Sequence, residues 1–535
     1  MKRQTIYLLL LTGLLFLFSC YEDLSTDATG SYPEIVLDAG DTPESLTCGY
    51  GETLHLTVNA SQEGTDPADL SYEWMIDIVP EAGKDRAVIS EGPEVEYLVL
   101  NSPNSKPYNL TLYVKNTKDG YTAIKNWHIY VVSTLGDGLL VAHTRDGGKT
   151  TQLSLTCASP ITYAYSASAP RVTDRLYELA NGGKSIEGRV TGLLARATSD
   201  LEVANPKSYG TERVMVTTDR NEILMLDPLN YSLVGRNEDL FSGTRYFSKF
   251  ESRLIGNVSA VSTFVSVEGH LYGCMEVMEY KYSPVSYGGT KTGVFGPNNT
   301  CAPLTNQGFI MCFDPVTKKF YGCNGVFLTQ SSMTAYEGVD TVPEADWLAD
   351  KEAVACGALK SLNTSYVMKD SANQYYLVEI CINQGSKAKI VPLNLPEVDK
   401  AIGWAFCDNC EVVYYYTPDT IYSTIVSGST SATKALSWKP DSSDEKITMV
   451  RQYTQGWYGT GQKDNSSKPG DLTYYEYILD TNRTQIVIVT YNEKTGEGKF
   501  YLRPFNVSTG MFSAFKNNGT YGGYGEITAI CGTRR

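Results

Sequence analysis

A repeated pattern of strand, polar turn and strand runs through the chain from residue 139 onward. Clear copies are Val214–Pro228, Gly308–Tyr321 and Val487–Leu502, and the units begin about 40–50 residues apart. Such a period is typical of a β-propeller. We therefore expect residues 135–535 to form a β-propeller with seven blades. A second set of sandwich domains is the alternative.

The last strand pattern suggests how such a ring would close. Glu526–Gly532 is an apolar, strand-like run at the C-terminus, and Leu139–Val141 is a similar run at the start of the repeats. Pairing of the two runs would close the ring and remove exposed strand edges.

The chain begins with a short basic and apolar segment that ends in a cysteine. Two basic residues precede an apolar run from Ile6 to Phe18, and Ser19 and Cys20 follow. This layout is typical of a secretory signal peptide. With its final cysteine it resembles a bacterial lipobox, in which residues 1–19 are removed and Cys20 is lipidated. The alternative, a transmembrane anchor, needs about 20 apolar residues, and this run is shorter.

The residues after the cysteine carry a second signal. Glu22 and Asp23 resemble the acidic export signal of Bacteroidetes-type lipoproteins on the outer face of the outer membrane. Residues 20–32 have no apolar period, which predicts a flexible tether after the lipidated cysteine. Because two or three acyl chains anchor a protein firmly, we expect lipid attachment to the outer membrane, facing the cell exterior.

Residues 33–134 contain strand patterns separated by turn signals. In Glu52–Asn59 apolar and polar residues alternate, as in a half-buried strand, with His55 on the polar face. Tyr72 and Trp74 place two aromatic side chains on one face of another strand, as a sandwich core requires. The pattern predicts an all-β sandwich of about a hundred residues.

The same region carries a family resemblance. Tyr72-Glu-Trp74, Tyr108–Asn116 and Asp119-Gly120 resemble a PKD-like, immunoglobulin-fold module. Leu135–Lys149, a strand with an Asp-Gly-Gly turn, follows directly. This order resembles the PKD-like family lipoproteins of Bacteroidetes, in which a tethered sandwich precedes a large β-rich domain. The resemblance implies an outer-membrane nutrient-uptake system, such as a TonB-dependent transporter complex, and implies no defined reaction.

The composition restricts the partners of the protein. The formal net charge is −15, which argues against nucleic acid, because phosphate binding needs a basic face. It also argues against electrostatic adhesion to anionic lipid, and it says little about neutral glycans. The chain has 38 Tyr but 16 Phe, and Tyr suits strands with one wet face.

The cysteines point to structure more than to chemistry. The chain has 12 cysteines. Without Cys20 eleven remain, and because this number is odd, at least one of them is unpaired. Most lie in apolar runs, and we expect few disulfides. Cys407-Asp-Asn-Cys410 has the spacing of a redox pair or half a zinc site. Because strand-like runs flank it, we interpret it as a hairpin turn that could carry a local disulfide.

Motifs for catalysis are absent from the sequence. The four histidines show no metal spacing, and there is no His-Glu-x-x-His, no Gly-x-Ser-x-Gly and no phosphate loop. We therefore expect no cofactor and no metal. Paired carboxylates, as glycosidases use, remain open. Asp441, Asp444 and Glu445 fall in a polar stretch and are expected to be a solvated loop.

Aromatic residues in the C-terminal third are candidates for binding. Trp457 and Tyr458 are flanked by glycines, and Trp438 lies nearby in the sequence. Exposed aromatic residues on turns can stack on sugars or anchor a partner protein; the alternative is that Trp457 belongs to the core of a blade.

Together these features predict a surface lipoprotein that binds a glycan, another nutrient or a partner protein without catalysis. A glycan-cleaving propeller enzyme with paired carboxylates is the rival hypothesis, and a purely adhesive protein is a third.

Overall fold

The structure is a computed structural model. It describes residues 33–533 except 81–84, 105, 134, 136, 163–164, 198–211, 242–251, 260–261, 268–269, 276–280, 288, 290–293, 297–308, 325–331, 360–363, 381–386, 456–478 and 514–518. In these residues no helix is long and apolar enough to cross a membrane. The chain divides into two compact units, Met1–Val132 and Ser133–Arg535. The expected signal peptide, Cys20 and the tether lie outside the described residues.

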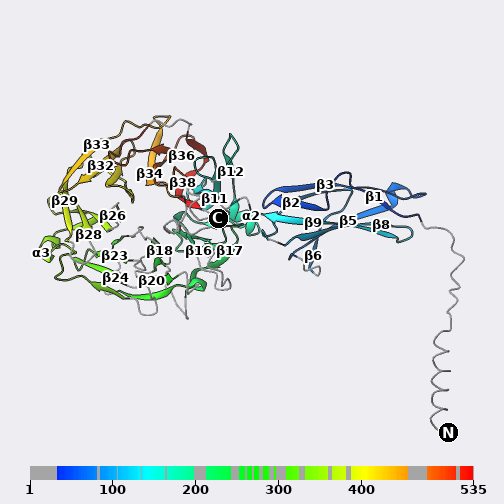
Figure 1. The fold of residues 1–535 in the computed structure, drawn as a ribbon, viewed down its shortest axis with the longest axis horizontal. Coiled ribbons are helices and arrows are strands. Elements are labelled where there is room, and N and C mark those ends of the chain that lie inside the picture. The colour runs from blue at the N-terminus through cyan, green and yellow to red at the C-terminus, as the bar shows by residue number, and fades with distance from the viewer. Residues whose placement is uncertain are drawn as a thin grey trace, which may run out of the picture. The chain divides into compact units, whose positions relative to one another are not determined.

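The first unit consists of short sheets (Figure 1). A five-stranded sheet has the order β2-β9-β8-β5-β6, and its pairings are antiparallel except for β2 with β9. Two-stranded antiparallel sheets pair β3 with β7 and β1 with β4. The strands are β1 (Val36–Asp38), β2 (Ser45–Gly49), β3 (Thr53–Thr57), β4 (Asn59–Ser61), β5 (Leu70–Asp77), β6 (Arg86–Ser90), β7 (Glu94–Leu98), β8 (Tyr108–Asn116) and β9 (Thr122–Val132).

The core of this unit contains two tryptophans. Trp74 on β5 and Trp127 on β9 are both fully buried, and their rings stack with centroids 5.4 Å apart. On β3 the side chains of Leu54 and Leu56 are buried while that of His55 is exposed, which confirms the predicted period of two. Alternation of this kind lets one face of a strand pack while the other meets water.

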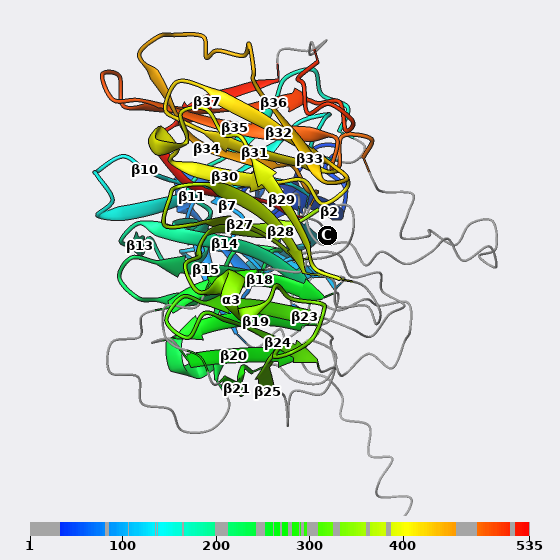
Figure 2. The same cartoon turned by 90° about the vertical axis from the view of Figure 1, so that its left-hand side faces the viewer.

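The second unit is a β-propeller built from antiparallel sheets of consecutive strands (Figures 1 and 2). Four of these sheets are four-stranded. Their strands are β14 (Val190–Ala197), β15 (Glu212–Thr218), β16 (Ile223–Leu226) and β17 (Leu233–Arg236); β26 (Glu352–Ala358), β27 (Thr364–Lys369), β28 (Tyr375–Ile380) and β29 (Lys389–Leu393); β30 (Gly403–Phe406), β31 (Val412–Tyr416), β32 (Ile421–Ser427) and β33 (Thr430–Ala435); and β34 (Glu445–Gln452), β35 (Gln485–Asn492), β36 (Glu497–Pro504) and β37 (Thr520–Tyr524).

One sheet of this unit has eight strands, in the order β18-β19-β20-β21-β25-β24-β23-β22. It is two antiparallel meanders joined by a parallel contact between β21 and β25. The strands are β18 (Ser252–Ser259), β19 (Ser262–Val267), β20 (His270–Met275), β21 (Ser283–Tyr287), β22 (Val294–Gly296), β23 (Phe309–Asp314), β24 (Lys319–Asn324) and β25 (Ser332–Ala335). Short helices are α2 (Leu176–Ala180), α3 (Ala345–Leu348) and the 3-10 turns Pro67–Asp69, Asn237–Leu240 and Val398–Lys400.

The first strand of each sheet lies toward a common centre. β14 lies against β18, β22 against β26, β26 against β30, and β30 against β34. In Figure 1 the labels of β18, β26, β34 and β38 surround the middle of the ring, and in Figure 2 successive sheets follow one below another. We call these strands, together with β38, the inner strands.

The ring closes through the pairing that the sequence predicts. β38 (Glu526–Thr533) pairs antiparallel with β10 (Gly138–Thr144), with Leu139 opposite Gly532 and Val141 opposite Ile530. The closing sheet continues through β11 (Thr150–Cys157) to β12 (Arg171–Thr173), and β13 (Ile186–Glu187) also pairs with β11. The two ends of this unit are therefore held in one sheet, and each occupies an edge that the other would leave open.

Hydrophobic cores lie between successive sheets. One cluster joins Val412 and Tyr414 of β31 to Ile486 and Ile488 of β35. The next cluster joins the other face of the β34–β37 sheet to the closing sheet. Because each sheet packs on both faces, its central strands read as nearly continuous apolar runs; all residues of β31 are buried.

Candidate functional site

Several of the inner strands have a β-bulge close to their first residues, whereas β30 pairs with its neighbour without a shift of register. Shifts of register leave one residue without a pairing partner, namely Thr191 in β14, Val354 in β26, Thr448 in β34 and Thr528 in β38. Thr191, Val354 and Thr448 are exposed and Thr528 is half-buried. A bulge turns a side chain out of the regular alternation of its strand. β14, β26, β34 and β38 are edge strands of the described sheets, and we call the bulge residues that they carry the axial end of the propeller.

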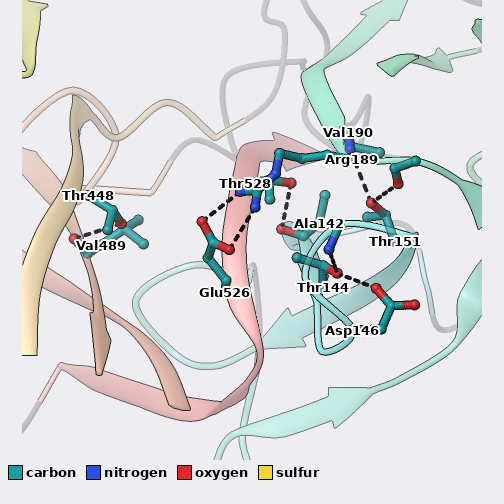
Figure 3. A network of polar contacts seen from close by, with 12 residues as sticks. Ala142, Thr144, Asp146, Thr151, Arg189, Val190, Thr448, Val489, Glu526 and Thr528 are labelled. Carbon is teal, nitrogen blue, oxygen red and sulfur yellow. Dashed lines mark hydrogen bonds and ion pairs between the residues drawn. The ribbon is translucent and has the colours of Figure 1, made fainter. Parts of the chain in front are cut away.

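The bulge residues are uncharged and β-branched. Thr528 Oγ1 lies 3.4 Å from the carbonyl oxygen of Ala142, and Thr448 Oγ1 lies 3.5 Å from that of Val489 (Figure 3). These contacts are long for hydroxyl hydrogen bonds, so the hydroxyls keep capacity for another partner.

The sequence carries a signal for this bulge that the strand-and-turn repeat alone does not reveal. Aligned on the bulge, five of the inner strands read as an apolar residue, a β-branched residue and a residue that is small in all but one case. The triplets are Val190-Thr-Gly192, Leu254-Ile-Gly256, Ala353-Val-Ala355, Ile447-Thr-Met449 and Ile527-Thr-Ala529.

A charged residue stands two positions before each of the four bulge residues, and each is compensated. Arg189 makes a bidentate ion pair with Glu526 at 2.6 and 2.9 Å, which ties β38 to the start of β14 (Figure 3). Hydrogen bonding to Glu526 raises the pKa of the Arg189 guanidinium. Glu352 lies 3.5 Å from Lys369, and Lys446 lies 2.6 Å from Asp419.

This pairing bears on the rival hypothesis of carboxylate catalysis. In the described part of the inner strands the carboxylates of Glu352 and Glu526 each face a cation, and no two acids share a site there. No group of three or more His, Cys, Asp or Glu residues that could hold a metal ion occurs among the described residues. The axial end, as far as it is described, therefore offers hydroxyls and aliphatic surface to a ligand and no acid–base pair.

Asp146 shapes the turn between β10 and β11. Its carboxylate accepts hydrogen bonds from the Thr150 hydroxyl at 2.7 Å, the Thr144 hydroxyl at 2.8 Å and the Lys149 backbone N–H at 2.9 Å. Hydrogen bonds from Thr150, Thr144 and Lys149 hold the pKa of Asp146 far below its usual range. This carboxylate therefore holds the turn and is not available as a base.

His143 and Ser154 are neighbours in the closing sheet but do not form a base and a nucleophile. His143 Nε2 lies 2.9 Å from Ser154 Oγ, and the Gly525 N–H donates to Nδ1 at 3.2 Å. Because Nδ1 accepts, Nε2 carries the proton in the neutral ring and cannot take one from Ser154. Burial, assisted by Arg145, lowers the pKa of His143 to about 4. The pair is structural.

Glu445 is buried, so the expected solvated loop is wrong for this residue. It begins β34 and is 3% exposed. Its carboxylate accepts from the Tyr501 hydroxyl at 2.6 Å, Lys499 Nζ at 3.0 Å and the Thr490 hydroxyl at 3.1 Å. Burial raises the pKa of Glu445, but these hydrogen bonds outweigh it and leave the pKa below its usual range.

Trp438, one of the sequence candidates, lies beside this cluster. Its ring meets that of Tyr501 edge-on with centroids 5.1 Å apart, and it is half-buried against the core between the β30–β33 and β34–β37 sheets. Much of its surface is therefore used for packing. The other candidates, Trp457, Tyr458 and Cys20, lie outside the described residues.

The ends of the connection that carries Trp457 and Tyr458 are described and are well ordered by hydrogen bonds. Gln455 N–H donates to Asn482 Oδ1 at 3.0 Å, and the Leu479 N–H donates to Gln455 Oε1 at 2.8 Å. The Arg483 N–H donates to the Tyr453 carbonyl at 2.9 Å. These hydrogen bonds hold the two described ends of the connection between β34 and β35 together, and we call these ends its base.

The comparisons with known proteins point to remote likenesses. No family model matches the chain, and no curated protein matches it. A quinonprotein alcohol dehydrogenase-like protein from Bacteroides thetaiotaomicron is 14% identical with a TM-score of 0.48, covering 94% of this chain and 100% of that one.

Two further solved structures are more distant. Apo AztD from Citrobacter koseri is 10% identical with a TM-score of 0.34, covering 86% of this chain and 98% of that one. The Cps50 (Swd1) β-propeller domain from Myceliophteria thermophila is 8% identical with a TM-score of 0.32, covering 61% and 84%. At these scores the propeller rests on the strand pairing of this chain itself.

Proposed function

We propose that this protein is a lipoprotein on the outer face of the outer membrane that binds a neutral glycan or a similar nutrient without catalysis. Cys20 is the attachment site, residues 20–32 are the tether, and the strands of residues 33–134 are a PKD-like, immunoglobulin-type sandwich. The propeller is seven-bladed, with β38, β14, β18, β22, β26, β30 and β34 as its inner strands. The protein serves an uptake system such as a TonB-dependent transporter complex.

The observation that carries the binding proposal is the chemistry of the axial end. The charges of Arg189, Glu352, Lys446 and Glu526 are compensated in ion pairs, and the exposed bulge side chains are hydroxyl-bearing or aliphatic. Compensated charge gives no preference for an ion, while hydroxyls and aliphatic surface suit the mixed polar and apolar faces of a sugar. Trp457, Tyr458 and Trp438 are the proposed binding residues for this ligand.

Binding is tested with the full-length protein purified in detergent and screened on a glycan array. A glycan that binds is then titrated against Trp457→Ala/Tyr458→Ala, against Thr448→Val, and against Tyr130→Ala as a matched control. Tyr130 is 37% exposed on β9 of the other unit. We expect the double variant to lose about tenfold or more in affinity and the control to stay within about twofold. Cleavage of the bound glycan, or equal affinity of all variants, would contradict the proposal.

Attachment is tested separately in cells. Cys20→Ala should move the protein from the membrane fraction to the soluble fraction, because the lipid anchor would be lost. Protease added to intact cells should digest the wild-type protein if it faces the exterior. Retention of Cys20→Ala in the membrane fraction would contradict lipid attachment through this residue.

A further inference from the structure

The Cys407–Cys410 turn lies at the junction of two blades. It connects β30 to β31, and the Cys410 N–H donates to the Cys407 carbonyl at 3.3 Å while the Cys407 N–H donates to the Val412 carbonyl at 3.2 Å. Both cysteines are buried, Cys407 completely. The structure holds them as thiols, hydrogen-bonded to each other through their sulfur atoms.

The tip of this turn contacts both ends of the connection between β34 and β35. The Asp408 N–H donates to Gln452 Oε1 at 3.0 Å, and Gln452 Nε2 donates to Asn409 Oδ1 at 2.8 Å. Asn409 Nδ2 donates to the Arg483 carbonyl at 2.8 Å. Gln452 is the last residue of β34, and Arg483 stands just before β35. The turn thus bridges the two points at which the connection leaves and re-enters the sheet.

An ion pair holds the same turn. Arg483 lies 3.3 Å from the carboxylate of Asp408, whose side chain is 8% exposed. Arg483 adopts a left-handed backbone with φ of 60°, a conformation that costs a non-glycine residue energy unless its surroundings fix it. The contacts with Asp408 and Asn409 supply that fixation. Any loosening of the turn between the cysteines would therefore release the base of the connection.

We propose that Cys407 and Cys410 form an intramolecular disulfide, and that this bond locks the turn as a clamp on the base of the β34–β35 connection. The sulfur contact, the tight turn and the burial carry the inference, since a disulfide needs neighbouring sulfurs on a compatible backbone. The oxidant is a disulfide-bearing donor, either a thiol oxidase protein or a low-molecular-weight disulfide. The clamp would act on the connection that carries the proposed binding residues Trp457 and Tyr458, so its role rests on the proposed function. The disulfide itself does not depend on those residues.

The exchange with the donor conserves atoms and electrons. Cys410, as its thiolate, attacks one sulfur of the donor and expels the other as a thiolate. Cys407 then loses its proton and its sulfur attacks Cys410 Sγ, which releases the second donor thiolate. The protein loses two protons and two electrons, and the donor disulfide takes them up and is reduced to two thiols. Because both sulfurs are buried in the folded propeller, the bond forms before the blades pack and is then shielded from reductants.

The first test needs no variant. Cells are quenched in acid, proteins are unfolded, and thiols are alkylated with N-ethylmaleimide without reductant before digestion and mass spectrometry. We expect the peptide with Cys407 and Cys410 to be unlabelled and lighter by two hydrogens, while Cys48 and Cys157, which are free thiols in the structure, are alkylated in the same sample. Alkylation of both Cys407 and Cys410 would overturn a disulfide in the cell.

A second experiment separates this inference from the proposed export. Purified full-length protein is unfolded, reduced and refolded with oxidised glutathione. The bond could close in the refolded protein while the alkylation test finds both cysteines as thiols in cells. That result would support the pairing of Cys407 with Cys410 and contradict the proposed export to an oxidising compartment. Failure to close in refolded protein of native circular dichroism would overturn the pairing whatever the location.

The clamp is tested by hydrogen exchange on Cys407→Ala/Cys410→Ala, with Cys48→Ala as the matched control. We expect faster exchange in residues 452–455 and 479–485 of the double variant only. If the double variant does not fold, the oxidised and reduced wild-type proteins are compared in its place. Equal exchange in those residues would overturn the clamp.

Discussion

The buried carboxylate of Glu445 offers a sharp test of how the last blade is held together. Three donors converge on it: the Tyr501 hydroxyl at 2.6 Å, Lys499 Nζ at 3.0 Å and the Thr490 hydroxyl at 3.1 Å. Hydrogen bonds to a charged group contribute about 1.5–3 kcal/mol each. Breaking one partner of a buried ion pair costs about 3–5 kcal/mol, because the other partner is left uncompensated. Glu445→Ala should therefore lower the free energy of unfolding by about 3–5 kcal/mol.

The assay is urea unfolding followed by circular dichroism, with Tyr501→Phe and the double variant completing a cycle. We expect a coupling energy of about 1.5–3 kcal/mol between Glu445 and Tyr501. Glu497→Gln is the matched control: its carboxylate is 42% exposed and 3.7 Å from the same Lys499, so its effect should be within about 0.5 kcal/mol. An equal effect of Glu445→Ala and Glu497→Gln would refute the reasoning.

The same carboxylate makes stability depend on pH. Its pKa in the folded protein lies below the ordinary value of 4.5, so the unfolded chain binds the proton more readily. Its contribution is therefore present above about pH 4.5 and is lost as the pH falls through the lower folded pKa. Glu445→Gln should reduce the loss of stability in that range, and an unchanged acid profile would contradict the assigned network.

Two further perturbations test the closing sheet. The pKa of His143 is lowered to about 4 from 6.5, so the unfolded chain takes up a proton first, and stability should fall by up to about 3 kcal/mol as the pH drops from 6.5 to 4. In His143→Gln the urea midpoint should depend less on pH between pH 7 and pH 5 than it does in the wild-type protein. Equal wild-type midpoints at these two pH values would argue against a neutral buried imidazole. Ile530 on β38 is 1% exposed, so Ile530→Ala should lower the free energy of unfolding in urea by about 2–5 kcal/mol. The control Ile402→Ala, at a side chain that is 53% exposed, should lower it by less than about 0.5 kcal/mol. A small effect of Ile530→Ala would contradict closure through this strand.

Much of the architecture could be predicted from local patterns. The alternation around His55 predicts a half-buried strand, and it is one. The repeated units predict antiparallel sheets, and the apolar runs at 139–141 and 526–532 predict the pairing of β10 with β38. The Cys407–Cys410 turn lies between two strands, as its flanking runs indicate. Single strands and turns depend on residues that are neighbours in the sequence, and the closing pair depends on two apolar runs at the ends of the repeat region. These features can therefore be predicted from the sequence.

The polar clusters could not be predicted in the same way. The polar neighbours Asp441 and Asp444 predict a solvated loop for Glu445. Its burial comes from Tyr501 and Lys499 on β36, a different strand of the sheet. The contact of the Cys407–Cys410 turn with Gln452 and Arg483 likewise joins segments of different blades.

By itself the sequence determined the β class of the chain and the order of its strand-rich parts: a stretch of short strands, then a series of repeated β units. These follow from composition and from periods of two and of about 40–50 residues. Only the tertiary structure decided which side chains meet at the axial end, which charges are compensated and which thiols touch. The physical reason is that the pattern of a strand fixes which of its side chains are buried, whereas the packing of the blades around the ring decides which residues those side chains contact.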